Sequence, residues 1–352
     1  MNLDDWRSRI NNLDDEILRL LNQRGTAALR IGELKRQQGL PYYIPEREAQ
    51  VLDRLVESTG GPLAGDAIRA IWREILSASL ALEHPLPIAY LGPPGTFTHQ
   101  AAVRRFGSSA QLLAVRTIAE IFDEVERGRA EFGVVPVENS TDGAVNVTLD
   151  RLIDSDVTIT GEMTLDISQH LISRALELGE VKMVCSHPQG LAQCRAWLAV
   201  HLPEAVAEET PSTAAAGERA RDDATVAAIA SDIAAQVHGV PILRARIEDN
   251  PANSTRFLVI GRRPVAPTGR DKTSILFSMK NEPGVLYSIL APIAERRLNL
   301  TKIESRPTKR RPWEYVNFVD FEGHQETDEV RAVLSEVRER CQFLRILGSY
   351  PA

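Results

Sequence analysis

Apolar residues recur every three or four positions along the first 34 residues, which is the period of an α-helix. This stripe consists of Trp6, Ile10, Leu13, Ile17, Leu20, Ala27, Ile31 and Leu34. Two further helices are predicted over 45–56 and 66–83, after breaks at Gly39-Leu40-Pro41 and Gly60-Gly61-Pro62. No strand pattern interrupts them, so residues 1–84 are predicted to form an all-α domain.

The pattern changes after residue 87 to short apolar or β-branched runs that alternate with helical stretches. Strands are predicted over 88–91, 111–115, 132–137, 157–160, 182–186, 226–229 and 257–260. Such alternation is typical of parallel or mixed sheets covered by helices. Residues 87–265 are long enough for two α/β lobes with a cleft between them, and we expect the chain to cross between lobes near Leu165 and near Arg246.

The last 81 positions, 272–352, follow a linker that contains Pro264, Pro267 and Gly269. Their pattern is strand, helix, strand, strand, helix, strand. This order predicts a ferredoxin-like α+β domain.

Composition narrows the classes of partner. The chain of 352 residues carries a formal charge of -7, whereas a nucleic-acid partner requires a basic face. No apolar run reaches 18 residues and the start lacks the pattern of a signal peptide, so we expect a cytoplasmic protein with no membrane partner. The cysteines Cys185, Cys194 and Cys341 lack metal-ligand spacing, and their odd number fits reduced thiols.

Arg24 lies on the apolar stripe of the first helix. Because burial of an unpaired guanidinium is costly, Arg24 needs a carboxylate, either from Glu48 or Asp53 as a structural ion pair or from a ligand. Lys35 lies eleven residues further on, hence on nearly the same face and roughly 16 Å along the axis. Two long basic side chains could therefore bind one small anion between them.

Arg47 and Glu48 stand at the start of the second predicted helix, and Ser79 and Glu83 share a face of the third. Each alone is more typical of a solvated surface. Together with Arg24 they resemble the all-helical chorismate mutases, whose binding residues fall here on Arg7, Arg24, Lys35, Arg47, Glu48, Ser79 and Glu83. The resemblance implies an intertwined helical dimer. Arg7 is roughly 25 Å from Arg24 on the same helix, so it would reach the site from another chain.

The implied reaction rearranges chorismate to prephenate and needs neither a metal nor a redox cofactor. Arginines would hold the two carboxylates, while Lys35 and Glu83 act as catalytic donors to the ether oxygen. Glu83 must be protonated to donate, whereas some family members have glutamine there. A second departure is Ile44, where some members have aspartate.

Polar motifs in the middle segment fall at the ends of predicted strands, where α/β proteins bind ligands. They are the segments 92–98, 135–140, 186–189 and 253–257. In this order they resemble prephenate dehydratase, a two-lobed fold like that of periplasmic binding proteins. The resemblance implies substrate-binding roles for Thr96, Glu138, Asn139, Ser140, His187, Ser254, Thr255, Arg256 and Phe257.

The implied dehydratase reaction expels the ring hydroxyl and carbon dioxide from prephenate to give phenylpyruvate. We expect Thr255 to be the catalytic donor to the leaving hydroxyl, with Arg256 on the pyruvyl carboxylate. Asn139, Ser140 and Thr96 would donate further hydrogen bonds. His187 precedes a proline at a predicted helix start, so it is either an acid or a structural cap.

Two motifs in the last segment, 280–287 and 299–307, resemble the phenylalanine-binding motifs of the regulatory ACT domain. The implied effector residues are Asn281, Gly284, Val285, Leu286, Glu304, Ser305, Arg306 and Pro307. Val285 replaces the alanine that is usual in the family. ACT domains generally bind amino acids between two subunits.

The resemblance covers the chain in the order mutase, dehydratase, ACT domain, which is that of the bifunctional chorismate mutase/prephenate dehydratase family. It implies chorismate and prephenate as substrates, L-phenylalanine as a feedback inhibitor, no cofactor and at least a homodimer. A dehydratase whose helical segment is only a dimerisation module, and a non-enzymatic amino-acid sensor, remain as alternatives.

Overall fold

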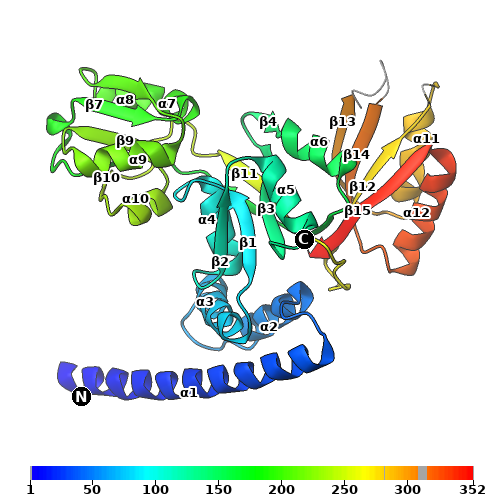
Figure 1. Cartoon of the computed structure of the whole chain (residues 1–352), viewed down its shortest axis with the longest axis horizontal. Coiled ribbons are helices and arrows are strands. Elements are labelled where there is room, and N and C mark those ends of the chain that lie inside the picture. The colour runs from blue at the N-terminus through cyan, green and yellow to red at the C-terminus, as the bar shows by residue number, and fades with distance from the viewer. Residues whose placement is uncertain (1, 281, 308–314, 352) are drawn as a thin grey trace. The chain divides into compact units, whose positions relative to one another are not determined.

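The structure of the chain is a computed structural model that describes residues 2–280, 282–307 and 315–351 (Figure 1). The described chain separates into two compact units. One unit holds residues 1–87 and 106–111, and the other holds 88–105 and 112–352.

The first unit is helical, as predicted. Its helices are α1 (Leu3–Gln38), α2 (Pro45–Glu57) and α3 (Gly65–Glu83). Helix α1 begins with a capping box between Asn2 and Asp5 and ends at Gly39, whose left-handed φ of 65° closes the helix. Helices α1 and α3 approach closely at Gly32, where a Cβ would lie 3.1 Å from the Cα of Glu83. A larger residue at 32 would therefore push apart the two helices.

The apolar stripe of α1 does not form a core within one chain. Ala28 and Gly32 are the buried residues of this helix, all of whose residues are described. Trp6, Ile10 and Ile17 remain 49%, 55% and 53% exposed. Ile31 and Leu34, at the C-terminal end of the stripe, are likewise 48% and 53% exposed, so the stripe stays largely exposed along its whole length.

The second unit begins with a mixed sheet and its helices, which form the first lobe. The strand order is β2-β1-β3-β11-β5, and β4 pairs with β3. Strands β1 and β3 are parallel, whereas β11 runs antiparallel to both β3 and β5. The elements are β1 (Pro87–Leu91), α4 (Phe97–Phe106), β2 (Gln111–Val115), α5 (Ile118–Glu126), β3 (Phe132–Asn139), β4 (Gly143–Ala144), α6 (Asn146–Asp154), β5 (Thr158–Asp166) and β11 (Ser254–Gly261).

The second lobe is built on a separate sheet of strand order β10-β6-β9-β7-β8. Its elements are β6 (His170–Ser173), η1 (Leu178–Glu180), β7 (Met183–Ser186), α7 (Pro188–Gln193), α8 (Arg195–His201), β8 (Val206–Glu209), α9 (Thr213–Asp222), β9 (Val226–Ala230), α10 (Asp232–His238) and β10 (Ile242–Arg244). The chain enters this lobe between β5 and β6 and leaves it between β10 and β11. Strands β4, β6, β8 and β10 were not predicted. Strands β4 and β10 have only two and three residues, and β6 and β8 contain polar residues that interrupt an apolar run.

The C-terminal domain has the predicted ferredoxin-like order of elements. They are β12 (Asp271–Ser278), α11 (Val285–Glu295), β13 (Leu300–Pro307), β14 (Tyr315–Glu322), α12 (Asp328–Arg340) and β15 (Phe343–Pro351), with antiparallel strand order β13-β14-β12-β15. One face of the sheet shares a core with α11 and α12. The other face joins the core of the first lobe, where Phe318 and Tyr350 cluster with Leu149 and Ile159. This sheet is therefore docked directly on the lobe that contains β3, β5 and β11.

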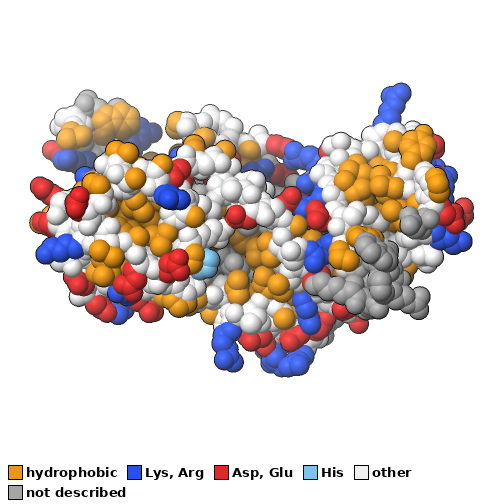
Figure 2. All heavy atoms as spheres, turned by 90° about the horizontal axis from the view of Figure 1, so that it is seen from above, with side chains coloured by type: hydrophobic (Ala, Val, Ile, Leu, Met, Phe, Trp, Pro, Cys, Tyr) orange, Lys and Arg blue, Asp and Glu red, His pale blue; other side chains and the backbone are white. Residues whose placement is uncertain are grey.

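Two features of the described residues bear on the possible partners of the chain, namely the character of its helices and the distribution of its charges. Among the described residues, no helix combines the length and apolar character that crossing a membrane requires. Figure 2 shows basic and acidic side chains mixed over the visible face of the molecule.

Candidate active and effector sites

Helices α1, α2 and α3 enclose a cavity of about 430 Å³ in the first unit. All three helices contribute residues to its lining, and so do Tyr42 and Ile44 from the loop between α1 and α2. The cavity brings together these predicted mutase residues: Arg24, Lys35, Arg47, Glu48, Ser79 and Glu83. Its described lining holds three basic and two acidic side chains, so the site is suited to an anion.

Arg24 contacts α3 inside this cavity. Its guanidinium donates a hydrogen bond to Ser79 Oγ and lies 5.9 Å from the centre of the Trp72 ring. Burial lowers the pKa of Arg24, while the nearby Glu83 carboxylate opposes that shift. Asp53, one of the two partners considered for Arg24, pairs instead with Arg69 at 2.6 Å.

Lys35 is held between the end of α3 and the loop before α2. Its Nζ donates to Glu83 Oε2 at 2.8 Å and to the carbonyl oxygen of Tyr42 at 2.7 Å. Both partners of the Lys35–Glu83 pair are largely buried, with 19% and 11% of the side chains exposed. Glu83 therefore accepts a hydrogen bond in this arrangement, whereas donating one to a ligand would require its protonation.

Arg7 lies outside this cavity. It is exposed near the start of α1 and pairs with Asp4 at 3.3 Å. Because it lies seventeen residues before Arg24 on a straight helix, about 25 Å away, it cannot reach the cavity of its own chain.

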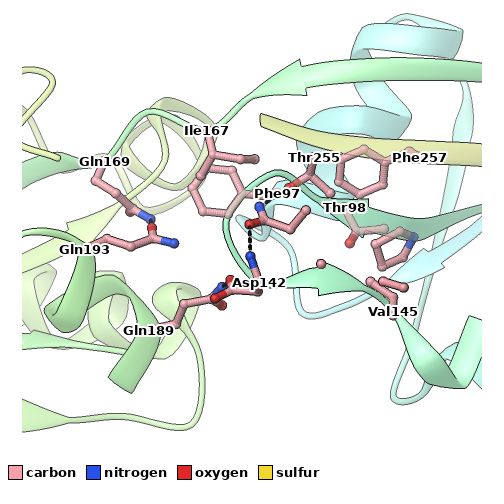
Figure 3. Close-up of a pocket in the computed structure, with 14 residues that line it drawn as sticks. Phe97, Thr98, Asp142, Val145, Ile167, Gln169, Gln189, Gln193, Thr255 and Phe257 are labelled. Carbon is pink, nitrogen blue, oxygen red and sulfur yellow. Dashed lines mark hydrogen bonds between the residues drawn. The ribbon is translucent and has the colours of Figure 1, made fainter. Parts of the chain in front are cut away.

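A second pocket, of about 270 Å³, lies in the cleft between the two lobes of the second unit (Figure 3). Thr98, Asn139, Thr255 and Phe257 line it from the first lobe. On the opposite side are three glutamines, Gln169, Gln189 and Gln193. Of the predicted dehydratase residues, Asn139, Thr255 and Phe257 are thus placed in the pocket.

Asn139 and Thr255 form the polar centre of the first-lobe wall. Asn139 Nδ2 donates to Thr255 Oγ1 at 2.8 Å and to Asn253 Oδ1 at 2.9 Å. Its Oδ1 accepts from the backbone N–H groups of Thr141 and Asp142, at 2.9 and 3.0 Å. The amide is therefore fixed in orientation, and because Thr255 Oγ1 accepts from it, the hydroxyl proton of Thr255 can be donated to a ligand.

The second-lobe wall is made of neutral amides. Gln169 Nε2 donates to Gln193 Oε1 at 3.0 Å, and Gln189 bonds the carboxylate of Asp142 across the cleft. Gln169 is 2% exposed, yet its Oε1 finds no hydrogen-bond partner among the described residues. None of the described residues that line this pocket is lysine or arginine.

Several predicted dehydratase residues shape turns rather than line this pocket. Thr96 Oγ1 donates to the carbonyl oxygen of Leu91 at 2.9 Å. Ser140 Oγ accepts from the backbone N–H of Ser254 at 2.9 Å. His187 is the N-cap of α7, where its side chain accepts a backbone hydrogen bond. For His187 the structural alternative therefore fits its placement better than the acid.

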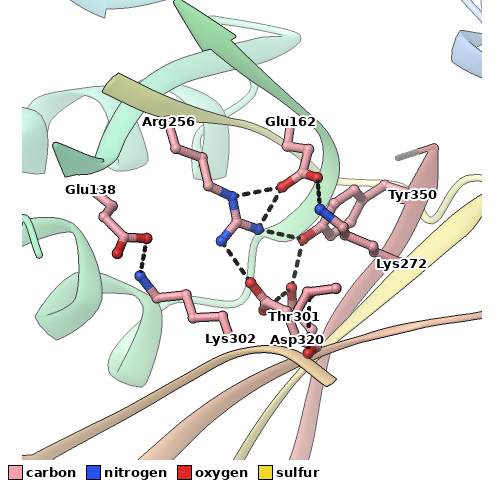
Figure 4. Close-up of polar contacts among 9 residues, drawn as sticks. Glu138, Glu162, Arg256, Lys272, Thr301, Lys302, Asp320 and Tyr350 are labelled. Carbon is pink, nitrogen blue, oxygen red and sulfur yellow. Dashed lines mark hydrogen bonds and ion pairs between the residues drawn. The ribbon is translucent and has the colours of Figure 1, made fainter. Parts of the chain in front are cut away.

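Arg256 and Glu138 do not line the pocket and point toward residues of the C-terminal domain (Figure 4). Arg256 donates to Glu162 at 2.6 Å and pairs with Asp320 at 2.7 Å, and Glu138 pairs with Lys302. The expectation that Arg256 holds the pyruvyl carboxylate does not fit this placement. Successive side chains of a strand point to opposite faces, so Thr255 and Arg256 cannot share one pocket.

The predicted effector residues lie on α11 and β13, except Asn281, which is outside the described residues. Gly284 adopts a φ of 77° as the N-cap of α11, with Val285 and Leu286 in its first turn. Glu304, Ser305, Arg306 and Pro307 are the last four residues of β13. Among them, Ser305 Oγ donates a hydrogen bond to Asn317 at 2.6 Å. Arg306 contacts α6, where it bonds Asn146 and pairs with Asp150 at 2.7 Å. Arg306 thus faces the dehydratase lobe.

The pocket residues that the sequence did not single out are mostly amides and loop residues. Gln169 lies in the crossing between lobes, and Gln193 ends the short helix α7. Thr98 and Gln189 did fall within the polar motifs 92–98 and 186–189, which are therefore the signals that could have found them.

Comparisons with known proteins agree with this division of the chain. Family models for chorismate mutase type II, prephenate dehydratase and the ACT domain match residues 6–84, 88–265 and 273–339. A bifunctional chorismate mutase/prephenate dehydratase of Aquifex aeolicus is 48% identical over 353 residues, which cover 99% of this chain and 98% of the relative.

Two solved structures each align with 76% of the chain. A prephenate dehydratase of Arthrobacter aurescens in complex with L-Phe aligns with a TM-score of 0.69 and 33% identity, over 76% of this chain and 90% of that chain. A structure described as a quorum-quenching acylase, GqqA, aligns with a TM-score of 0.69 and 31% identity, over 76% of this chain and 98% of that one.

The fold, the two polar sites and these matches define a multidomain enzyme of aromatic amino acid biosynthesis. The chain belongs to the bifunctional chorismate mutase/prephenate dehydratase family. The resemblance drawn from its sequence motifs is thereby confirmed, and the alternative of a non-enzymatic sensor is set aside.

Proposed function

We propose that chorismate binds in the cavity of the helical unit and is rearranged there to prephenate. The observation that carries this proposal is the convergence of Arg24, Lys35 and Arg47 on one cavity. Arg24 and Arg47 would hold the carboxylates of the compact reactive conformer. Lys35 would donate to the ether oxygen, where negative charge develops in the transition state.

We further propose that this mutase site is completed by Arg7 of a second copy of the chain. The described lining has three basic and two acidic side chains, a net charge of +1, whereas chorismate carries two carboxylates. One additional arginine would match the charge of the substrate. The exposed stripe of α1, with Trp6 49% and Leu13 51% exposed, supplies an apolar face on which a second helix could pack.

Mixing two inactive variants tests this shared site. Arg7→Ala and Arg24→Ala should each abolish most mutase activity. After the two variants are unfolded and refolded together, about a quarter of the wild-type rate should return, because a mixed dimer keeps one intact site. If the mixture stays as inactive as its components, Arg7 does not act in another chain's site.

In the cleft of the second unit, Thr255 is proposed as the donor that helps the ring hydroxyl of prephenate to leave. The electrons of the bond to the departing carboxylate form the new ring π bond while the C–O bond breaks. The leaving hydroxide takes up the hydroxyl proton of Thr255 to become water, and Thr255 regains a proton from solvent before the next turnover. The hydrogen bond that Thr255 Oγ1 accepts from Asn139 supports this role, because it directs the hydroxyl proton away from Asn139.

The neutral glutamine wall fits the decarboxylation. A carboxylate that is gripped by a buried cation is stabilised relative to neutral carbon dioxide, which would slow its loss. Gln169, Gln189 and Gln193 can orient the two carboxylates of prephenate by hydrogen bonds without such stabilisation. These amides thus replace Arg256 as the proposed binders of the substrate's carboxylates.

Separation of the two activities tests both site assignments. Lys35→Ala should block conversion of chorismate while leaving turnover of added prephenate intact. Thr255→Ala should do the reverse, so that prephenate accumulates from chorismate. The assignments would be wrong if either variant lost both activities while retaining the wild-type melting temperature.

L-Phenylalanine is proposed as the inhibitor that binds the ACT domain, because the similar prephenate dehydratase of Arthrobacter aurescens forms a complex with L-Phe. The segment from Gly284 to Leu286 and the strand end from Glu304 to Pro307 carry the proposed contacts, with the exception of Arg306, which is bound to α6. Gly284→Val should abolish inhibition by L-phenylalanine. Gly179→Val should leave inhibition unchanged, because Gly179 is an open position outside this domain. Loss of inhibition in both variants, or in neither, would contradict this site.

A further inference from the structure

Strands β3 and β11 carry two neighbouring pairs of facing residues, of which one pair lines the cleft pocket and the other contacts the C-terminal domain. Thr255 lies opposite Asn139, and Arg256 lies opposite Glu138. The first pair lines the cleft pocket, whereas both members of the second pair bind residues of the ACT sheet. Each ACT contact is therefore one peptide unit away from a residue of the active site.

Arg256 is the more deeply buried of the two anchors. Its guanidinium bridges Glu162 on β5 and Asp320 on β14, and it donates to Tyr350 Oη at 3.2 Å. Asp320 is fixed in turn by Ser274 Oγ at 2.6 Å. Burial alone would lower the pKa of Arg256, but the carboxylates of Asp320 and Glu162 outweigh it and raise the pKa. The side chain is therefore a permanent cation in a closed ion-pair network.

Glu138 forms the second anchor with Lys302, which is 10% exposed and lies on β13. The same strand carries the proposed effector residues Glu304 to Pro307. Lys302 and Arg306 lie on one face of β13, four residues apart, and both reach the first lobe. A shift of β13 would consequently displace the partner of Glu138.

We infer that Arg256 and Glu138 are positioning residues through which the ACT sheet sets the geometry of the Thr255–Asn139 pair. Neither side chain touches the substrate. Asp320 holds Arg256 on β11, and Lys302 holds Glu138 on β3. The neighbouring residues on the opposite face of the same strands, Thr255 and Asn139, present a hydroxyl and an amide to the cleft. An effector that moves β13 or β14 thereby alters the donor geometry without entering the cleft.

Reversal of the Glu138–Lys302 charges tests this inference in the full-length protein. The variants are Glu138→Lys, Lys302→Glu and the double exchange, assayed for kcat and KM with prephenate and for inhibition by L-phenylalanine. We expect kcat to fall by about tenfold or more in each single variant, because small displacements of a donor are costly. KM should change little, and the double exchange should restore both kcat and inhibition. Lys302 lies outside the pocket, so a loss in Lys302→Glu can act only through its partner.

Mutase activity and the melting temperature of the same samples report whether each variant folds. A second variant, Asp320→Asn, removes one charge from the Arg256 network at nearly constant volume and should lower kcat more than it raises KM. The inference is overturned if Lys302→Glu has wild-type kcat and inhibition. It is also overturned if Glu138→Lys is inactive and the double exchange gives no rescue, since Glu138 would then act on the substrate itself. The inference rests on dehydratase activity, which the wild-type protein in the same assay establishes separately.

Discussion

The Nζ atom of Lys35 lies 2.8 Å from Oε2 of Glu83, so the proposed cationic donor of the mutase site is paired with a carboxylate that could donate only when protonated. Glu83→Gln should therefore raise mutase turnover by roughly tenfold or more, because its neutral amide can donate a hydrogen bond to the ether oxygen, where an ionised carboxylate would repel the developing negative charge. Steady-state rates of prephenate formation by the two proteins would show this. A lower rate in the variant would mean that Glu83 serves only to hold Lys35.

Thr255 should matter for turnover more than for affinity. Thr255→Ala removes the proposed donor and should lower kcat for prephenate by about 100-fold or more, with little change in KM. Thr255→Ser keeps the hydroxyl and is the matched control, expected to retain most activity. Steady-state formation of phenylpyruvate measures both variants. A rise in KM alone would assign Thr255 to binding.

The neutral wall of the dehydratase pocket should be sensitive to an added negative charge. Gln193→Glu keeps the shape but places a carboxylate near a dianionic substrate, and KM should rise by roughly tenfold or more. Gln193→Met removes the hydrogen bond to Gln169 without adding charge, so it separates loss of that bond from repulsion. Equal effects of the two variants would contradict a substrate carboxylate at this wall.

The buried thiols should be unreactive in the folded protein. Burial raises the pKa of Cys185 to about 11 and that of Cys194 to about 12. Since the thiolate is the reactive form, about one in a thousand Cys185 side chains is ionised at pH 8. Iodoacetamide should therefore modify the partly exposed Cys341 first, and the other two only after denaturation. Mass spectrometry of peptides after timed quenching gives the order, and early labelling of Cys194 would contradict it.

The docking of the ACT sheet on the first lobe depends on a glycine of β15. A Cβ at Gly348 would lie 2.2 Å from the carbonyl oxygen of Ile159, so Gly348→Ala should force the two strands apart. The expected loss of stability is about 1–3 kcal/mol. Gly179→Ala is the control, because its Cβ would meet nothing within 4 Å. Chemical denaturation would compare them, and similar midpoints for both variants would refute the close approach.

The helical unit was the most predictable part of the fold, because its apolar residues repeat with a clear period and its breaks contain glycine and proline. The motif residues Arg24, Lys35 and Glu83 lie on helices whose faces could be assigned from spacing alone, and they meet in one cavity. Burial of the α1 stripe was not predictable in the same way. Spacing shows which side chains share a face but not what covers that face, and Trp6 and Ile10 are exposed in the structure.

The dehydratase site was predicted less well, for two physical reasons. Neighbouring residues of a strand face opposite sides, so a contiguous motif such as Ser254 to Phe257 cannot act as one surface. If the predicted strand 257–260 is extended back to Ser254, this rule places Thr255 and Arg256 on opposite faces of the sheet. The glutamines Gln169 and Gln193 reach the pocket through the crossing of the chain between lobes, and a single sequence holds no local pattern for such contacts.

Incubation of the metal-free purified protein with chorismate tests the assignment of both activities most directly. Prephenate and phenylpyruvate are followed separately by NMR, with and without L-phenylalanine. We expect phenylpyruvate to form by way of prephenate and its formation to be suppressed by L-phenylalanine. Unchanged chorismate would reduce the helical unit to a dimerisation module, and accumulation of prephenate without phenylpyruvate would contradict a working dehydratase in the cleft.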